Sequence, residues 1–440
     1  STSVASETDL PAAEYDDTVQ PGGRRAPTTT APWLGWDLGD REYSRIALGL
    51  FAAGFATFAL VFDAQAALPA LSAAFATTTA EAALTVSATT LGLAASVLVW
   101  AVAADRIGRV AVMRLSLAAA LVVALCLVLA DGLWQLIALR GLLGVALGAV
   151  PSVAMAYLAE ELAPGRVSIA AGIFVAGNTV GGIAGRLVAG LGSAWWGWQV
   201  GFALVAVLAV AMATVFWLAI PPPRGFVPGD RGDYRLRTRI LFQLTDPVML
   251  GLYAQGFLLM GAFGAVYNLL GYRLLDEPFG LPATGASLVF LAYLAGTAAS
   301  RWGGVAALRW GHLRVILAGI GIQLAGIGLL ASDRLLVTLA GLVVFTVGCF
   351  TAHPVASGLT GQRALLGRAQ GTALYQLAWL SGTALFGWLA GLLFDRWGWD
   401  AVLELVGGLC LLAAGLGWLG LHTFAGRRPP LPARVRTVSG

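Results

Sequence analysis

The stretch VWAVAADRIGRVAVM, residues 99–113, sets a short charged turn between two apolar runs. Asp105, Arg106, Gly108 and Arg109 fall within this turn, although the chain on either side carries almost no charge. Charged groups between two bilayer-crossing segments must lie where they reach water, and glycine permits the sharp backbone path that such a turn needs. The stretch therefore predicts a tight turn between two membrane-spanning helices.

The composition of the whole chain supports this interpretation. Hydrophobic residues make up 58% of the 440 positions, charged residues make up 11%, and the mean hydropathy is +0.80. Soluble proteins carry about 45–50% apolar and about 25% charged residues. The chain is therefore predicted to be an all-α, polytopic membrane protein, long enough for roughly a dozen spans of about 20 residues.

Two long hydrophobic regions contain the predicted spans, six in each. They lie near residues 46–72, 84–104, 111–130, 133–158, 167–191 and 198–220, then near 247–272, 284–300, 313–331, 335–357, 370–392 and 400–421. Residues 1–44 lack an apolar core and are predicted to be a disordered cytoplasmic tail, not a secretory signal. The predicted organisation is this tail, an N-terminal lobe over 45–220, a cytoplasmic linker over 221–246, a C-terminal lobe over 247–421 and a basic cytoplasmic tail over 422–440.

The arginines predict how the chain is oriented in the membrane. All 27 basic residues are arginine. Three fall in loops on the side opposite the tails (Arg273, Arg334 and Arg396), and two fall inside spans (Arg140 and Arg186), which leaves 22 of the 27 on the side of the tails. Positive residues in short loops stay on the cytoplasmic side. Both termini are therefore predicted to be cytoplasmic, in the cell membrane.

Three ionisable residues inside predicted spans are candidate functional residues. Each of Asp63, Arg140 and Arg186 costs roughly 2.5–3.5 kcal/mol to insert, so such residues are rare unless they have a role. Asp63 and Arg186 can neutralise one another as a buried pair, or Asp63 can carry a coupling proton beside the two arginines. One acid against two arginines leaves a positive pocket, which favours an anionic or carboxylate-bearing substrate.

Other residues in the spans give less specific signals. Gly172, Gly177, Gly181 and Gly185 recur nearly every four residues, so they line one helix face and favour close helix packing. His353 directly precedes Pro354 and is expected at a helix break that touches cytoplasmic water, with a proton relay as the alternative. The remaining polar candidates either face a central cavity or join helices; they are Gln65, Asn178, Tyr267, Asn268 and Gln376.

The charged turn has a counterpart in the second half of the chain. In GGVAALRWGHLR, residues 303–314, the residues Gly304, Arg309, Gly311 and His312 occupy the offsets that Ala101, Arg106, Gly108 and Arg109 occupy in the first half. A similar turn at the same place in each six-helix half is what a duplicated transporter architecture predicts.

These motifs resemble the major facilitator superfamily, whose turn signature is G-x-x-x-D-R-x-G-R. The match runs through Asp105, Arg106, Gly108 and Arg109, with Ala101 in place of the leading glycine. LIALRGLLGVALGAV (136–150) is similar to the family's helix with an intramembrane arginine and spaced glycines. AGNTVGGIAGR (176–186) is similar to the antiporter signature G-P-x-x-G-P-x-x-G-G, with Asn178 and Gly182 in place of the prolines and Arg186 in place of the last glycine.

The resemblance implies a fold and a mechanism. It implies twelve transmembrane helices in two pseudo-symmetric six-helix lobes, and the drug and metabolite efflux branch with proton antiport. Asp105, Arg106, Gly108, Arg109, Gly177, Gly181 and Gly185 would then control the conformational change. Asp105 would lie beside the start of the eleventh helix, near Gly371, in one transport state.

The predicted function is secondary active transport of a small organic molecule by alternating access, driven by protons and directed outward. Uptake of an organic anion by proton symport is the alternative within this class, and a membrane-embedded sensor or enzyme is the alternative outside it. Without lysine there is no phosphate-binding lysine loop, and no metal-ligand spacing of His and Cys occurs. The chain is therefore predicted not to be an enzyme and to hold no cofactor and no metal. We further expect a monomer without a nucleic-acid partner, whose partners are the substrate, protons and the bilayer.

Overall fold

The computed structural model describes residues 33–226, 236–364 and 368–423. Residues from Gly35 onward belong to one unit, and the unit before it, Ser1–Leu34, is described only at Trp33 and Leu34. The predicted tail over 1–44 therefore lies largely outside the described residues, as do part of the predicted linker and all but the first two residues of the predicted C-terminal tail. Residues 35–44 are described, however, and α1 already begins at Arg41.

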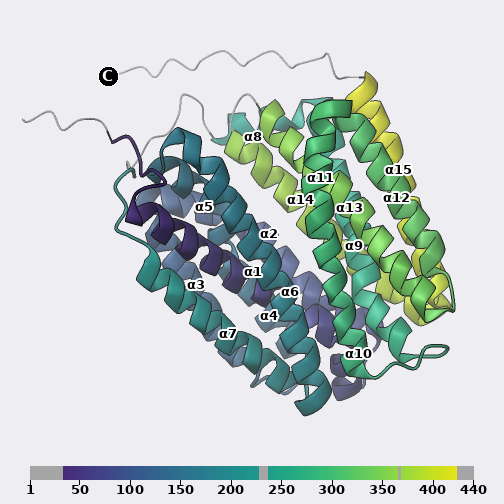
Figure 1. The fold of residues 1–440 in the computed structure, drawn as a ribbon. Coiled ribbons are helices and arrows are strands. Elements are labelled where there is room, and N and C mark those ends of the chain that lie inside the picture. The colour runs from purple at the N-terminus through teal and green to yellow at the C-terminus, as the bar shows by residue number, and fades with distance from the viewer. Residues whose placement is uncertain (1–32, 227–235, 365–367, 424–440) are drawn as a thin grey trace, which may run out of the picture. The chain divides into compact units, whose positions relative to one another are not determined.

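Helices account for nearly all of the described residues, and the one β-bridge among them joins Trp36 to Leu162 (Figure 1). The elements are α1 (Arg41–Phe75), α2 (Thr79–Ile107), α3 (Arg109–Leu127), α4 (Leu133–Leu147), α5 (Ala149–Glu161), η1 (Pro164–Arg166), α6 (Val167–Trp196), α7 (Trp198–Ala219), α8 (Leu236–Leu244), α9 (Pro247–Leu275), α10 (Ala283–Leu288), η2 (Val289–Ala292), α11 (Tyr293–Trp310), α12 (His312–Leu330), α13 (Leu335–Arg363), α14 (Arg368–Trp397), α15 (Trp399–Trp418) and η3 (Leu419–Thr423).

The predicted twelve spans are confirmed: in the described residues, twelve helical segments are long and apolar enough to cross a membrane. We refer to α1–α7 as the first half and to α9–η3 as the second half. The fourth span is α4 followed by α5, and the eighth is α10, η2 and α11 in succession. α1 begins and η3 ends on one side of the bundle, the upper side in Figure 1, and α10 begins on the lower side.

The predicted repeat of the turn is visible in the backbone. Gly108 ends α2 with φ 99°, and Gly311 ends α11 with φ 87°, a conformation that residues with a side chain rarely adopt. Each glycine N–H donates to the carbonyl four residues earlier, Ala104 and Ala307, at 3.0 Å. The second helix of the pair starts at the next residue in both cases. The two halves therefore make this turn in the same way.

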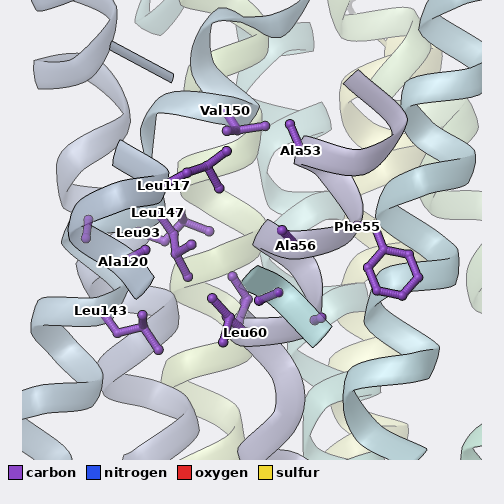
Figure 2. Close-up of a cluster of buried hydrophobic side chains, with 14 of the residues drawn as sticks. Ala53, Phe55, Ala56, Leu60, Leu93, Leu117, Ala120, Leu143, Leu147 and Val150 are labelled. Carbon is purple, nitrogen blue, oxygen red and sulfur yellow. The ribbon is translucent and has the colours of Figure 1, made fainter. Parts of the chain in front are cut away.

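Buried side chains form two hydrophobic clusters that follow the two halves closely. The first is centred on α1, and Figure 2 shows Ala53, Ala56 and Leu60 of α1 on the side that faces Leu93 of α2, Leu117 of α3 and Leu147 of α4. The second is centred on α9. Small residues allow the helices to approach: a Cβ on Gly144 of α4 would lie 2.0 Å from the carbonyl oxygen of Thr89 in α2. Such packing fixes the rotation of each helix, and with it the direction of its polar side chains.

Candidate functional site

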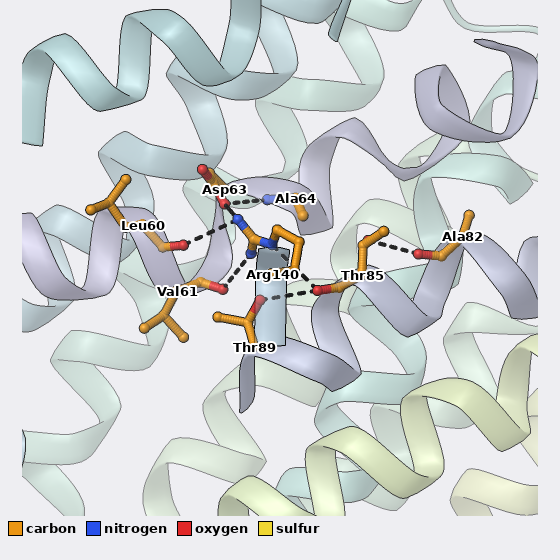
Figure 3. Close-up of polar contacts among 8 residues, drawn as sticks. All are labelled: Leu60, Val61, Asp63, Ala64, Ala82, Thr85, Thr89 and Arg140. Carbon is orange, nitrogen blue, oxygen red and sulfur yellow. Dashed lines mark hydrogen bonds and ion pairs between the residues drawn. The ribbon is translucent and has the colours of Figure 1, made fainter. Parts of the chain in front are cut away.

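Asp63 and Arg140 form an ion pair inside the first half (Figure 3). Arg140 Nη1 on α4 donates to Asp63 Oδ1 on α1 at 2.5 Å, and both side chains are at most 1% exposed. Nη1 also donates to the carbonyl of Leu60 in α1, while Nη2 donates to that of Val61 in α1 and Nε to that of Thr85 in α2, at 3.1–3.3 Å. Asp63 Oδ1 also accepts the N–H of Ala64 at 2.7 Å. The pair therefore ties together three helices, α1, α2 and α4.

Arg186 lies elsewhere, so the alternative in which it pairs with Asp63 is wrong. Its Nε donates to the Oε1 of Gln65 at 2.7 Å, and its Nη1 donates to the carbonyl of Gly182 at 2.8 Å. Among the described residues, Nη2 has no hydrogen-bond partner and no carboxylate lies within ion-pair distance. Asp63 faces away because two residues along an α-helix correspond to about 200° around its axis. Gln65 therefore points to Arg186 while Asp63 points to Arg140.

Aromatic rings cover the Arg186 guanidinium. Its central carbon lies 4.4 Å from the ring centroid of Phe62, 4.3 Å from that of Tyr293 and 5.8 Å from that of Phe290. Such contacts stabilise a cation by about 0.5–2 kcal/mol, the larger value applying where water is excluded. Tyr293 and Phe290 belong to the second half and Phe62 to the first. Arg186 is therefore held by rings from both halves, and no carboxylate of the described chain lies in ion-pair contact with it.

A cavity of about 160 Å³ lies between the halves beside Arg186. We call it the central cavity. Its lining residues come from α1, α6, α9, α11, α13 and α14; they are Phe58, Phe62, Gln65, Asn178, Thr179, Gly182, Arg186, Met260, Phe263, Gly264, Tyr293, Phe350, His353, Trp379 and Thr383. Pockets for small molecules are mostly apolar, with a few polar groups that orient the ligand. The central cavity has this character.

The predicted polar residues divide between the cavity and the packed helices. Gln65, Asn178 and Arg186 line the central cavity; Asp63, Arg140, Tyr267, Asn268 and Gln376 do not. Tyr267 instead shares a hydrogen bond with Thr346 (2.6 Å), and Asn268 Oδ1 accepts from Gln65 Nε2 (2.7 Å).

His353 is not at a helix break, contrary to expectation. α13 runs unbroken past it with Pro354 inside the helix, and His353 lines the central cavity. The hydroxyl of Tyr375 lies 2.8 Å from His353 Nδ1 and donates to the His353 carbonyl at 3.0 Å. The aromatic lining, which includes Phe58, Phe263, Phe350 and Trp379, was not predictable from the sequence, because an aromatic residue in an apolar span has no distinguishing pattern.

Three of the four predicted glycines bring α6 against α1. A Cβ on Gly177, Gly181 or Gly185 would lie 2.2–2.3 Å from a carbonyl oxygen of α1. Gly172 is different, since a Cβ there would meet nothing within 4 Å. The close contact of α1 with α6 holds Gln65 beside Arg186.

The charged turn forms a network within the first half. Arg109 Nη1 contacts Asp105 at 2.6 Å, and its Nη2 contacts Glu160 at the end of α5 at 2.9 Å. Arg106 is exposed. The atoms nearest to the Cβ position of Gly371 belong to Ala364, to Met249 of α9 and to Gln243 of α8. Among the described residues, the hydrogen bond and ion pair of Asp105 are both with Arg109, so its contact with α14 in one transport state stays a prediction.

The side-chain hydrogen bonds that join the halves, among the described residues, all lie on the lower side. They are Gln65–Asn268, Ser72–Tyr272, Ser87 to the Ala384 carbonyl, and Asp395 to the backbone N–H groups of Thr79 and Ala80, at 2.7–3.1 Å. A second cavity, the lower cavity, lies beyond Gln65; its lining includes Gln65, Pro69, Ser193, Ser287 and Phe290. Gln65 thus forms part of the wall of both cavities.

Comparisons with known proteins agree on one family. Residues 46–303 match the family described as the Major Facilitator Superfamily. The chain is 33% identical to the MFS-type transporter YybF of Bacillus subtilis (86% of this chain, 94% of that protein) and 33% identical to the inner membrane transport protein YnfM of Escherichia coli (86% and 91%). A bacterial homolog of the human lysosomal transporter Spinster has the same fold, with TM-score 0.73, 14% identity and coverage of 89% and 100%. The D-xylose–proton symporter has TM-score 0.67, 14% identity and coverage of 89% and 98%.

Proposed function

Since this chain belongs to the major facilitator superfamily and is a transporter of that type, we propose that it moves a small organic anion across the membrane by alternating access. The observation that carries the proposal is Arg186, a buried arginine that lines the central cavity with no carboxylate beside it in the described chain. A buried charge without a counter-charge is costly, and a bound anion would offset that cost.

The charges of the first half support an anionic substrate. Asp63 lies against Arg140 at 2.5 Å, so these two charges cancel within the packed helices. The Arg186 charge then remains on the cavity wall, while Nη2 is a donor with no hydrogen-bond partner among the described residues. A carboxylate, sulfonate or phosphate accepts hydrogen bonds from a guanidinium in this arrangement.

Alternating access is supported by where the halves touch. The side-chain hydrogen bonds between them, among the described residues, lie on the lower side, and one of them, Gln65–Asn268, lies at the wall shared by the central and lower cavities. We propose that this conformation is closed on the lower side and that the upper side, which carries most arginines, faces the cytoplasm. The protein would then be in an inward-facing state.

A proton gradient is the proposed driving force, with Asp63 as the proton carrier. Asp63 Oδ2 has no hydrogen-bond partner among the described residues, although it is buried. Protonation would remove the charge that holds Arg140 and would loosen α1 from α4. The proposed direction is export, based on the glycines at 177, 181 and 185, which resemble an antiporter signature and pack on α1.

The test is flux in proteoliposomes under an imposed pH gradient, with matched anionic and cationic compounds. We expect gradient-dependent movement of organic anions, lost in Arg186→Gln and kept in Arg334→Gln, which removes an exposed arginine outside the cavity. Movement of cations alone would contradict the anion proposal. Anion movement in the same direction as the proton would replace export by symport. Gradient-driven flux in Asp63→Asn would transfer the proton role to His353 or to Glu404, an acidic residue of α15.

A further inference from the structure

The central cavity combines one cation with an aromatic wall. Its aromatic residues are Phe58, Phe62, Phe263, Tyr293, Phe350 and Trp379. Among the described residues, Arg186 is the one arginine that lines it, and the other polar side chains of the lining are neutral amides, hydroxyls and His353. Phe62 and Tyr293 lie over the Arg186 guanidinium, and its Nη2 has no hydrogen-bond partner in the described part of the chain, which leaves this donor for a ligand.

We infer that the cavity binds an aromatic monoanion, a planar apolar body with one carboxylate or sulfonate group. This inference rests on the proposed function and makes it more specific. One anionic group pairs with Arg186, and the body replaces water against the aromatic rings. A second anionic group would have no cation to receive it and would lose its hydration on entry. A small anion without a planar apolar ring system would leave the aromatic wall of the cavity uncovered.

Four probes of graded chemistry test the substrate class: 1-naphthalenesulfonate, 1,5-naphthalenedisulfonate, methanesulfonate and the uncharged 2-naphthalenemethanol. Binding to the purified protein can be followed by tryptophan fluorescence, since Trp379 lines the cavity. We expect 1-naphthalenesulfonate to bind at least about tenfold more tightly than the other three, a difference of about 1.4 kcal/mol. Arg186→Gln should weaken it by at least about tenfold, and Arg334→Gln should leave it unchanged.

The outcomes separate this inference from the proposed function. If methanesulfonate or the disulfonate bound as tightly as 1-naphthalenesulfonate, the inference that the ligand is an aromatic monoanion would be overturned. Unchanged binding of 1-naphthalenesulfonate in Arg186→Gln would overturn it as well. If an aliphatic anion exchanged across proteoliposomes while 1-naphthalenesulfonate did not bind, anion transport would stand and the substrate class would be wrong. If 1-naphthalenesulfonate bound through Arg186 but no anion crossed the membrane, the substrate-class inference would stand and the transport proposal would fail.

A different observation, the hydrogen-bond chain through Gln65, carries a second inference. Gln65 Oε1 accepts from Arg186 Nε, and Gln65 Nε2 donates to Asn268 Oδ1, both at 2.7 Å. Asn268 belongs to the second half, and its Nδ2 has no other partner among the described residues. One amide side chain therefore connects Arg186 to the contact between the halves, at the wall shared by the two cavities.

We propose that Gln65 couples anion binding to the opening of the lower side. An anion on Arg186 competes with the Gln65 oxygen for the guanidinium, because an ionised acceptor binds it more strongly than an amide does. Gln65 is then free to turn, its bond to Asn268 is lost, and the central and lower cavities join. Gln65 acts here as a positioning residue, since its effect passes through the contact between the halves.

The test measures the lower-side distance between spin labels at Trp196→Cys and Asp276→Cys, in a background without the native cysteines. Both positions are exposed and lie in different halves. We expect saturating 1-naphthalenesulfonate to lengthen this distance in the otherwise unaltered protein. Gln65→Leu should lengthen it without ligand and should abolish most of the ligand response.

Ser72→Ala is the matched control, because it removes another bond between the halves, that to Tyr272, without touching Arg186. It should shift the resting distance but keep the ligand response. A ligand response in Gln65→Leu as large as that in Ser72→Ala would overturn the coupling role, as would a ligand-free distance equal to that of the unaltered protein.

Discussion

Arg140 and Arg186 carry the same side chain, and both are buried in spans of the first half, but their surroundings are opposite. Arg140 meets a carboxylate at 2.5 Å and three backbone carbonyls. Arg186 meets an amide oxygen, one carbonyl and aromatic rings, and it faces a cavity. Burial alone therefore does not mark a functional residue. What distinguishes the two is whether the charge is already neutralised by the protein.

The largest effect is expected for Arg140→Gln. It leaves the Asp63 carboxylate buried without its counter-charge, and breaking a buried ion pair in this way costs about 3–5 kcal/mol. Thermal unfolding in detergent should show a large loss of stability. The double variant Asp63→Asn with Arg140→Gln should recover part of it, because no charge is then unpaired. Additive losses in this double-mutant cycle would show that the two residues do not interact in the folded protein.

A smaller effect is expected for Asp63→Asn, which removes the other charge of the Asp63–Arg140 pair. The amide oxygen can still accept from Arg140 Nη1, and the three carbonyl partners remain. We expect Asp63→Asn to destabilise the fold by about 1–2 kcal/mol less than Arg140→Gln does, because an amide acceptor replaces the carboxylate and the guanidinium keeps its other hydrogen bonds. Flux driven by a pH gradient should be lost, whereas counterflow exchange of substrate should persist because it needs no net proton movement. A loss of both would indicate that Asp63 has a purely structural role.

A still smaller change in stability is expected for Arg186→Gln, although its effect on binding is large. No carboxylate in the described chain is left unpaired, and the substitution removes the guanidinium from a site that lacks a counter-charge. The expected loss is about 1 kcal/mol, the magnitude of one or two hydrogen bonds. If Arg186→Gln unfolded the protein as severely as Arg140→Gln, the distinction between the two arginines would not hold.

The sequence predicts the spans well because hydrophobic length is a property of each segment by itself. The turns at Gly108 and Gly311 were predictable because each one also depends only on the residues of its own short segment. The partner of Asp63 was not, because it depends on helix rotation: Asp63 and Gln65 are close in sequence but point to different arginines. The aromatic wall was also missed, since its rings come from several helices and meet only in the folded chain.

The smallest effect is expected at a third arginine–aspartate pair, Arg166 with Asp37, which lies at 2.5 Å near the upper end of α6 and is exposed. The Leu38 N–H and then the Arg166 guanidinium hold the pKa of Asp37 below its ordinary value. A carboxyl with a lowered pKa stabilises the fold above its unfolded pKa, and this contribution is lost as the pH falls through the lowered value. Water and salt screen an exposed pair, so Asp37→Asn should change the unfolding temperature at neutral pH less than any variant above. The difference from the unaltered protein should shrink further in 1 M salt and should vanish once the pH has fallen below the lowered pKa of Asp37, where the carboxyl is protonated in both states. A loss comparable to that of Arg140→Gln would mean that contact geometry, and not removal from water, sets the strength of these pairs.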